Sequence, residues 1–307
     1  MEVRKVNGFF IIFVIGYIGL SVVCASIMAY AQNSGIAVPD WIQYVMSEGI
    51  ILLIAIIYMI VQRIDPIREI PYKRIGIVDV ILSLVAGYCL IPAVLLISNL
   101  SMLFSTNYLE EGTTTLLTYP FAMQVILLAV IPPLVEELIF RGIFFGSYRK
   151  AGMTGAALMS GLLFGCFHLN INQALYAFVI GIVFAYMVEA TGSLWSSVIA
   201  HFAVNTYSIG IVQILKMAGM YAQDGSVSET FENAESVAGQ STAITVVQIA
   251  MIAVIAAVFM MLAVLCIRTM AKRHGNLEKM KIQNVKLSHI KNYFTAPVIV
   301  GIVVCVM

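Results

Sequence analysis

The chain has 307 residues, of which 61% are hydrophobic and only 11% are charged. Its mean hydropathy is +0.97. Soluble domains are about half apolar and about a quarter charged, so this composition excludes a water-soluble fold and indicates a membrane protein. The net charge is +1, and no basic stretch with interleaved aromatic residues suggests a nucleic-acid partner. The five cysteines lack the spacing of a disulfide or metal framework, which favours apolar positions inside helices.

Long apolar segments run through most of the chain. A helix needs about 20 apolar residues to cross a bilayer. Eight segments fit: 8–31, 42–62, 76–99, 119–147, 153–169, 171–189, 194–215 and 244–268. A ninth, 296–307, is shorter and can be half a span, a truncated span or an interfacial helix. The sequence therefore predicts an all-α polytopic membrane helical bundle of about eight transmembrane helices with a possible partial ninth. We expect one integral membrane domain over residues 1–307.

Positive charges gather in alternate loops of this arrangement. Lys and Arg accumulate on the cytoplasmic side of membrane proteins. Arg4 and Lys5 precede the first span, four further cations separate the second span from the third, and a basic run from Arg268 to Lys291 follows the eighth. The intervening loops contain almost no cations. We therefore expect a multi-pass protein of the cell membrane with a cytoplasmic N-terminus.

The fourth predicted span carries two carboxylates and a guanidinium, although each ionisable group in a membrane costs on the order of 3 kcal/mol. Glu137 and Arg141 stand four residues apart and can pair. Glu136 lies about 100° round the helix, which leaves it free to face a cavity. Pro132 and Pro133 remove two N–H donors one turn earlier. They predict a break or kink that places the carboxylates at the start of a helical half and admits water.

Two later spans contribute further polar side chains. His168 follows Phe164 by one turn in the fifth span, and His201 precedes Asn205 by one turn in the seventh. An amide facing lipid would be unsatisfied, so we expect Asn205 to point inward. Each of these residues alone is compatible with a hydrogen bond between helices. Their occurrence together with Glu136 on spans four, five and seven favours a common functional site.

Three other acidic residues lie near the ends of predicted spans: Glu48, Asp79 and Glu189. Side chains at such positions can reach the interface or its water. We interpret them as interfacial rather than functional.

The motifs E-E-x-x-x-R, F-x-x-x-H and H-x-x-x-N, in this order on separate spans, resemble those of the CAAX protease and bacteriocin-processing (CPBP/Abi) family. The resemblance covers residues 117–215, the predicted catalytic core. It implies a CAAX-protease-like intramembrane peptidase that hydrolyses peptide bonds within or beside the membrane. For a bacterial member of this size, a membrane-bound peptide or signalling protein is a more plausible substrate than a prenylated CAAX protein.

The resemblance also implies a role for each motif residue. Glu136 would be the general base that takes a proton from the attacking water, and His168 would help to hold that water. His201 and Asn205 would donate hydrogen bonds to the oxyanion of the tetrahedral intermediate. The remaining motif residues would form a structural ion pair: Glu137 and Arg141.

A metal-dependent version of the site uses the same side chains. Glu136, His168 and His201 can bind Zn²⁺ as three protein ligands and leave a fourth position for water. The family has been described both as a metalloprotease and as a metal-independent glutamate protease. The sequence contains no H-E-x-x-H motif. We therefore expect no tightly held metal and keep zinc as the alternative.

Two non-proteolytic functions remain open from the sequence. The protein can be a catalytically idle membrane scaffold that regulates a partner membrane protein, although such members typically lose motif residues that are present here. It can also be a small transporter that moves protons through Glu and His residues. Transporters often contain inverted repeats with paired broken helices, and only one proline-interrupted span is visible here.

Overall fold

The computed structural model describes residues 3–105, 119–219, 242–282 and 291–306, and these residues form helices without a strand. Seven of the described helices are long and apolar enough to cross a membrane. The predicted all-α polytopic bundle is confirmed, and the protein is an integral membrane protein. Part of the basic run that ends at Lys291, residues 283–290, lies outside the described residues.

The helices follow one another along the chain with short connections. The first half contains α1 Val3–Asn33, α2 Trp41–Val61, α3 Pro66–Glu69, α4 Ile77–Ser101, α6 Phe121–Gln124, the π-helix η2 Val125–Val130, α7 Ile131–Glu137 and the π-helix η3 Leu138–Phe145. The second half contains α8 Gly146–Tyr148, the 3₁₀ turn η4 Arg149–Ala151, α9 Met153–Phe167, α10 Ile171–Thr191, α11 Trp195–Met217, α13 Thr242–Arg273, the 3₁₀ turn η5 Leu277–Met280 and α15 Ala296–Val306.

The number of long spans differs from the predicted eight, because the predicted fifth span is a short helix. α9 has 15 residues, which gives about 22 Å of helix against a hydrocarbon core of about 30 Å. It starts at Gly152, whose φ is 133°, and ends before Leu169, whose φ is 54°. Both backbone conformations interrupt a right-handed helix. The predicted partial ninth span is α15, an apolar helix of 11 residues.

α10 occupies the centre of the bundle and contacts α9, α4, α11 and α13. Close packing against α9 depends on glycine. A Cβ atom at Gly161 would lie 2.7 Å from the carbonyl oxygen of Phe178, and one at Gly165 would lie 2.5 Å from that of Ala174. The absence of a side chain therefore lets the two backbones approach at membrane depth. This contact fixes the position of the end of α9, which carries His168.

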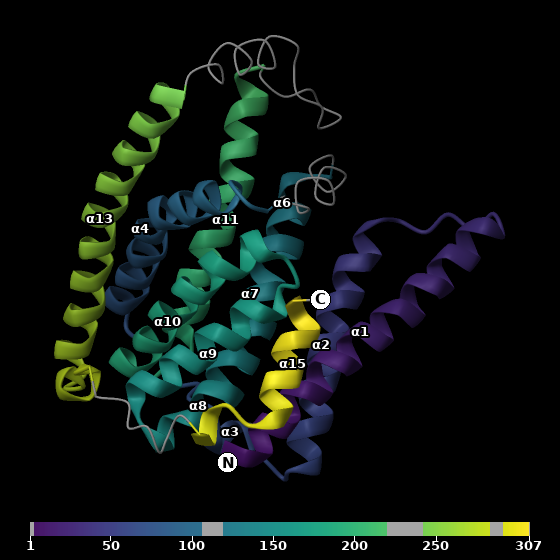
Figure 1. Ribbon diagram of the computed structural model, residues 1–307, viewed down its shortest axis with the longest axis horizontal. Coiled ribbons are helices and arrows are strands. Elements are labelled where there is room, and N and C mark those ends of the chain that lie inside the picture. Colours follow the sequence, from purple (N-terminus) through teal and green to yellow (C-terminus); the bar gives the residue numbers. More distant parts are fainter. Residues whose placement is uncertain (1–2, 106–118, 220–241, 283–290, 307) are drawn as a thin grey trace.

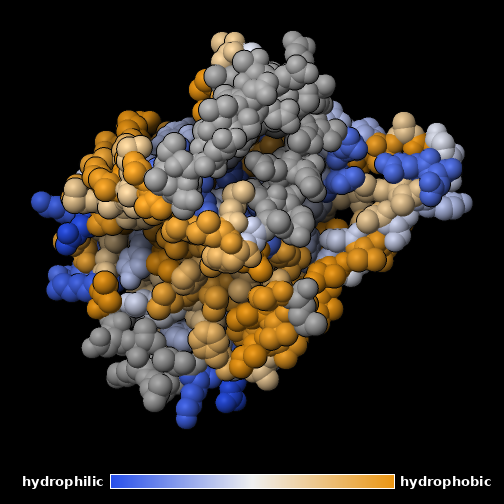
Figure 2. Space-filling model, turned by 45° about the horizontal axis from the view of Figure 1, so that its top comes forward, coloured by the Kyte–Doolittle hydropathy of each residue, from blue (hydrophilic) through white to orange (hydrophobic). Residues whose placement is uncertain are grey.

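The outer helices present apolar side chains to their surroundings. In Figure 1 the α1–α2 pair projects to the right of the bundle, and α13 runs along its left edge. Only 11% of the most apolar window of α13 is buried, against 56% for α10. Figure 2 shows a broad hydrophobic surface with hydrophilic residues at its margins. This distribution fits helices whose outer faces contact lipid.

The fourth predicted span is one helical run whose hydrogen-bond pattern changes along its length. The prediction of a break at Pro132 and Pro133 is wrong, because the chain stays helical through both residues. π-helical turns precede the prolines at Val125–Val130 and follow the carboxylates at Leu138–Phe145. The wider turns accommodate the missing donors without ending the helix. Glu136 and Glu137 consequently lie at the end of α7 rather than at the start of a helical half.

Ion pairs connect helices at the end of the bundle that holds the N-terminus, the lower end in Figure 1. Asp79 at the start of α4 lies 3.2 Å from Arg273 Nε and 3.0 Å from His274 Nε2. Glu189 on α10 lies 2.6 Å from Arg149 Nε. Both carboxylates are buried, whereas Arg149 and Arg273 reach the surface. This arrangement agrees with the interpretation of Asp79 and Glu189 as span-end residues.

Candidate active site

A buried ionic network joins α7, η3 and α11. Arg141 Nη1 lies 2.9 Å from Glu137 Oε1, and neither side chain is exposed. The same carboxylate oxygen accepts a hydrogen bond from His201 Nδ1 at 3.1 Å. A carboxylate only accepts, so Nδ1 carries the hydrogen and Nε2 is the nitrogen left to face the rest of the site. Glu137 therefore neutralises Arg141 and also fixes the orientation of His201.

The ring of Phe164 gathers the polar side chains from three helices. The guanidinium carbon of Arg141 lies 4.3 Å from its centroid. The imidazole rings of His168 and His201 lie 4.7 and 5.8 Å from it, both edge-on. A cation over an aromatic face is attracted to it, and this attraction is stronger away from water. The F-x-x-x-H motif thus supplies both an imidazole and the platform on which the other groups pack.

Glu136 differs from its neighbour in both partner and access. Its side chain is 13% exposed, whereas that of Glu137 is fully enclosed. Its Oε2 lies 3.7 Å from His201 Nε2, beyond hydrogen-bond distance. A water molecule or substrate group could contact both. Of the two adjacent carboxylates, Glu136 is the one available for chemistry.

His168 lies at the end of α9, where its ring is held by the backbone. Its Nδ1 lies 2.8 Å from the carbonyl oxygen of Phe164. Because a carbonyl only accepts, Nδ1 donates and Nε2 remains an acceptor. His168 also lies close enough to His201 and Arg141 for electrostatic interaction. The structure therefore brings His168 and His201 to one site with Nε2 acceptors or donors available to a third molecule.

Asn205 points inward, but its nearest partner is backbone. Its amide nitrogen donates to the carbonyl oxygen of Leu128 at 2.9 Å. That carbonyl would normally accept from residue 132 in an α-helix or residue 133 in a π-helix, and both are prolines without an N–H. Asn205 therefore satisfies an acceptor that the two prolines leave open. A primary amide has two N–H groups, so one donor remains.

Sequence reasoning missed two residues beside Glu136. Glu48 on α2 and Tyr176 on α10 both interact electrostatically with the Glu136 carboxylate. The interpretation of Glu48 as interfacial is wrong, because its Oε2 is buried and has no hydrogen-bond partner. The one available signal was its position seven residues into an apolar helix, about 10 Å from the start. Tyr176 gave no signal, since aromatic residues are frequent throughout the chain.

The proposed zinc ligands do not form a ligand set in this arrangement. Among the described residues, no three His, Cys, Asp or Glu side chains are grouped to hold a metal ion. Both nitrogens of His201 face carboxylates, and Nδ1 of His168 faces a backbone carbonyl. We therefore derive no chemical step that passes through a metal.

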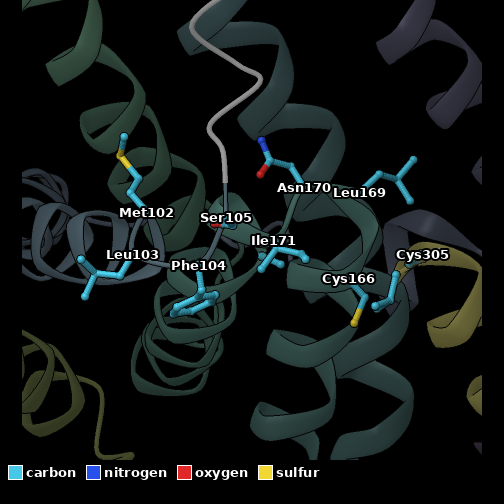
Figure 3. Close-up of a pocket in the computed structure, with 11 residues that line it drawn as sticks. Met102, Leu103, Phe104, Ser105, Cys166, Leu169, Asn170, Ile171 and Cys305 are labelled. Atoms are coloured by element: carbon cyan, nitrogen blue, oxygen red, sulfur yellow. The ribbon is translucent and has the colours of Figure 1, made fainter.

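A cavity of about 600 Å³ lies beside the polar site rather than at it. Figure 3 shows the end of α4 on one side and Cys166, Leu169 and Cys305 on the other. The lining contains the neighbours of His168 in sequence, but it does not contain Glu136, His168, His201 or Asn205. The cavity therefore belongs to the surroundings of the site and supplies none of its ionisable groups.

Comparison with known proteins places a peptidase signature on the segment that carries this site. The model of the family described as "Type II CAAX prenyl endopeptidase Rce1-like" matches residues 118–207. The chain is 32% identical over 88 residues to the "Putative membrane peptidase YdiL" of Bacillus subtilis (strain 168). That alignment covers 28% of this chain and 36% of the relative, so it spans about a third of the relative's length. No solved structure matches the chain. The resemblance to the CAAX protease family is confirmed over this segment, and it supports a membrane protease at the family level.

Proposed function

We propose that the protein is an intramembrane endopeptidase that hydrolyses peptide bonds of membrane-associated peptides or proteins. The observation that carries the proposal is the division between two adjacent carboxylates. Glu137 is enclosed and paired with Arg141, while Glu136 is partly accessible and faces His201 at 3.7 Å. A free carboxylate beside an oriented imidazole, in a region shielded from bulk water, is suited to general-base chemistry.

The proposed reaction begins when Glu136 takes a proton from a water molecule that His168 Nε2 helps to hold. The water oxygen bonds to the carbonyl carbon of the substrate, and negative charge develops on the carbonyl oxygen. His201, protonated and held at Nδ1 by Glu137, presents Nε2–H to this oxyanion. The second N–H of Asn205 also points to it in our proposal. Removing one such donor typically costs about 2.7–4 kcal/mol of transition-state stabilisation.

The intermediate collapses when the carbon–nitrogen bond breaks and the departing amine takes a proton. The products are a carboxylic acid and an amine. Glu137 and Arg141 form no bond to substrate in this scheme and act by holding His201 and the helix in place. We propose no tightly bound cofactor, with zinc as the alternative. Metal content of protein purified without a histidine tag, under controlled chelation, tests that choice.

We further propose a bacterial cell membrane as the location, with the N-terminus in the cytoplasm. The distribution of Lys and Arg among the loops supports this orientation. We expect the substrate to be a membrane-bound peptide or signalling protein, and a membrane protein partner is compatible with this role. Accessibility of single introduced cysteines, one near Arg4 and one near Gly35, tests the orientation.

The decisive experiment compares new protein termini in membranes of cells that express wild type or Glu136→Ala at matched levels. Glu278→Ala provides a control, because Glu278 is 79% exposed and lies outside the long apolar helices. Cleavage products that occur with wild type and Glu278→Ala but not with Glu136→Ala support the proposal and identify the substrate. Identical products in all three, with equal amounts of folded protein, would contradict it and favour the scaffold function.

A further inference from the structure

The peptidase reaction needs a proton donor for the departing amine, and a second buried carboxyl group lies beside Glu136. Glu48 comes from α2, which packs against α7. Its Oε2 is enclosed by protein and makes no hydrogen bond. Its carboxylate is close enough to Glu136 for a direct electrostatic interaction. An acidic side chain placed this way in an apolar helix is a candidate for function.

The surrounding charges leave Glu48 without a counter-ion. Arg141 is committed to Glu137 at 2.9 Å, and His201 contacts Glu137 through Nδ1. Two neighbouring carboxylates in a low-dielectric space do not both stay ionised, because their repulsion adds to the cost of burying each charge. The pair therefore shares a proton. Glu136, which is partly exposed, is the better placed of the two to be the ionised base, and the enclosed Glu48 oxygen is the better place for the proton.

We propose that Glu48 is a second catalytic carboxyl group, which donates a proton to the departing amine after Glu136 has taken one from water. This inference rests on the proposed peptidase function. The carbon–nitrogen bond breaks as the nitrogen takes the Glu48 proton, which leaves Glu48 ionised and Glu136 protonated. Transfer of that proton from Glu136 to Glu48 restores the starting state. One water is consumed, and one carboxylic acid and one amine are released.

The first test locates the shared proton without using activity. Infrared difference spectra of the protein in lipid nanodiscs at neutral pH separate protonated carboxyl groups from carboxylates. We expect a protonated-carboxyl band in wild type and in the exposed control Glu278→Gln, and its loss in Glu48→Gln. A band that persists unchanged in Glu48→Gln would place the proton elsewhere and overturn the proposal.

The second test separates an acid from a structural residue by changing the leaving group. The probes are a synthetic peptide that contains the cleavage site mapped in cells and the same peptide with a thioester at the scissile bond. A departing thiolate needs little protonation. We expect Glu48→Gln to lower kcat for the amide by about 100-fold or more, to leave KM unchanged, and to slow the thioester far less. Glu48→Asp should recover part of the amide rate.

The two proposals fail in different ways. If Glu136→Gln cleaves both probes as fast as wild type, the peptidase function proposed above is wrong, and the role of Glu48 falls with it. If Glu136→Gln is inactive while Glu48→Gln slows amide and thioester equally, the peptidase function stands and the acid role of Glu48 is wrong.

Discussion

Two clusters in this protein have almost the same composition and different surroundings. Each joins a buried carboxylate to an arginine and a histidine: Glu137, Arg141 and His201 in the site, and Asp79, Arg273 and His274 between α4 and α13. In the site, the exposed fractions of the three side chains are 0%, 0% and 5%. In the second cluster the carboxylate is 2% exposed, but the arginine and histidine are 45% and 30% exposed.

The difference shows how access to water decides what such a cluster does. In the Asp79 cluster, water can replace either cation, so the contact holds two helices together without depending strongly on one partner. In the Glu137 cluster no water replaces a lost partner, and the remaining charge stays uncompensated. The enclosed cluster therefore fixes the positions of His201 and Glu136, whereas the open one works as a clip at the end of the bundle.

The largest effect that tests this comparison is expected for Arg141→Met. The substitution leaves the buried Glu137 carboxylate with His201 as its remaining partner among the contacts described here. Loss of one member of a buried pair costs about 3–5 kcal/mol. We expect a corresponding fall in the free energy of unfolding, measured by denaturant titration in mixed micelles, together with loss of proteolysis.

A double variant separates loss of charge from loss of volume. Glu137→Gln combined with Arg141→Met removes both charges and should recover a large part of the stability that Arg141→Met loses. It should not recover proteolysis, because His201 no longer has a carboxylate to orient it. An Arg141→Met protein as stable as wild type would show that the cluster is not isolated from water.

The second prediction concerns the space around Arg141. A Cβ atom at Gly181 would lie 2.9 Å from Arg141 Nη2 and 2.9 Å from the Cα atom of Gly161. Overpacking of this kind typically costs about 1–3 kcal/mol, so Gly181→Ala should lower the free energy of unfolding by that amount. Gly8→Ala is the matched control, since no atom lies within 4 Å of a Cβ there. We expect the control to be neutral or slightly stabilising, as Ala favours a helix. Equal effects of the two substitutions would refute tight packing at Arg141.

The sequence predicts those parts of the site that depend on spacing within one helix. The four-residue interval between Glu137 and Arg141 corresponds to the 2.9 Å contact in the structure. The inward direction of Asn205 follows from the cost of an unsatisfied amide in lipid. In the same way, the hydropathy pattern predicts an all-helical bundle, because a lipid environment leaves few alternatives for the backbone.

Features that depend on contacts between helices could not be read from the sequence. The hydrogen bond from His201 to Glu137 joins residues 64 positions apart. The burial of Glu48 beside Glu136 depends on how α2 packs against α7. The continuity of the helix through Pro132 depends on π-helical turns, which have no clear sequence signature. The short length of α9 follows from backbone angles at Gly152 and Leu169, while hydropathy alone continues past both.

A smaller effect is expected at the contact between Asn205 and Leu128. Asn205→Ala leaves the Leu128 carbonyl without its donor and should cost about 1 kcal/mol of unfolding free energy. In a Pro132→Ala background, residue 132 regains an N–H that can bond this carbonyl, so the same substitution should cost less. A fall in kcat that is equal in both backgrounds would identify the separate contribution of Asn205 to the oxyanion. Equal stability losses in both backgrounds would contradict the capping role.

The smallest expected effect lies in the open cluster and completes the comparison. Arg273→Gln removes a cation that is 45% exposed, while His274 remains 3.0 Å from Asp79. Exposed ion pairs contribute about 0–1 kcal/mol, and salt screens them. We expect Arg273→Gln to lower the free energy of unfolding by no more than this and to leave proteolysis unchanged. Added salt should narrow the difference from wild type, since it weakens the native pair. A loss as large as that of Arg141→Met, and insensitive to salt, would mean that the Asp79 cluster is closed to water in the membrane and that the distinction between a clip and a catalytic support is wrong.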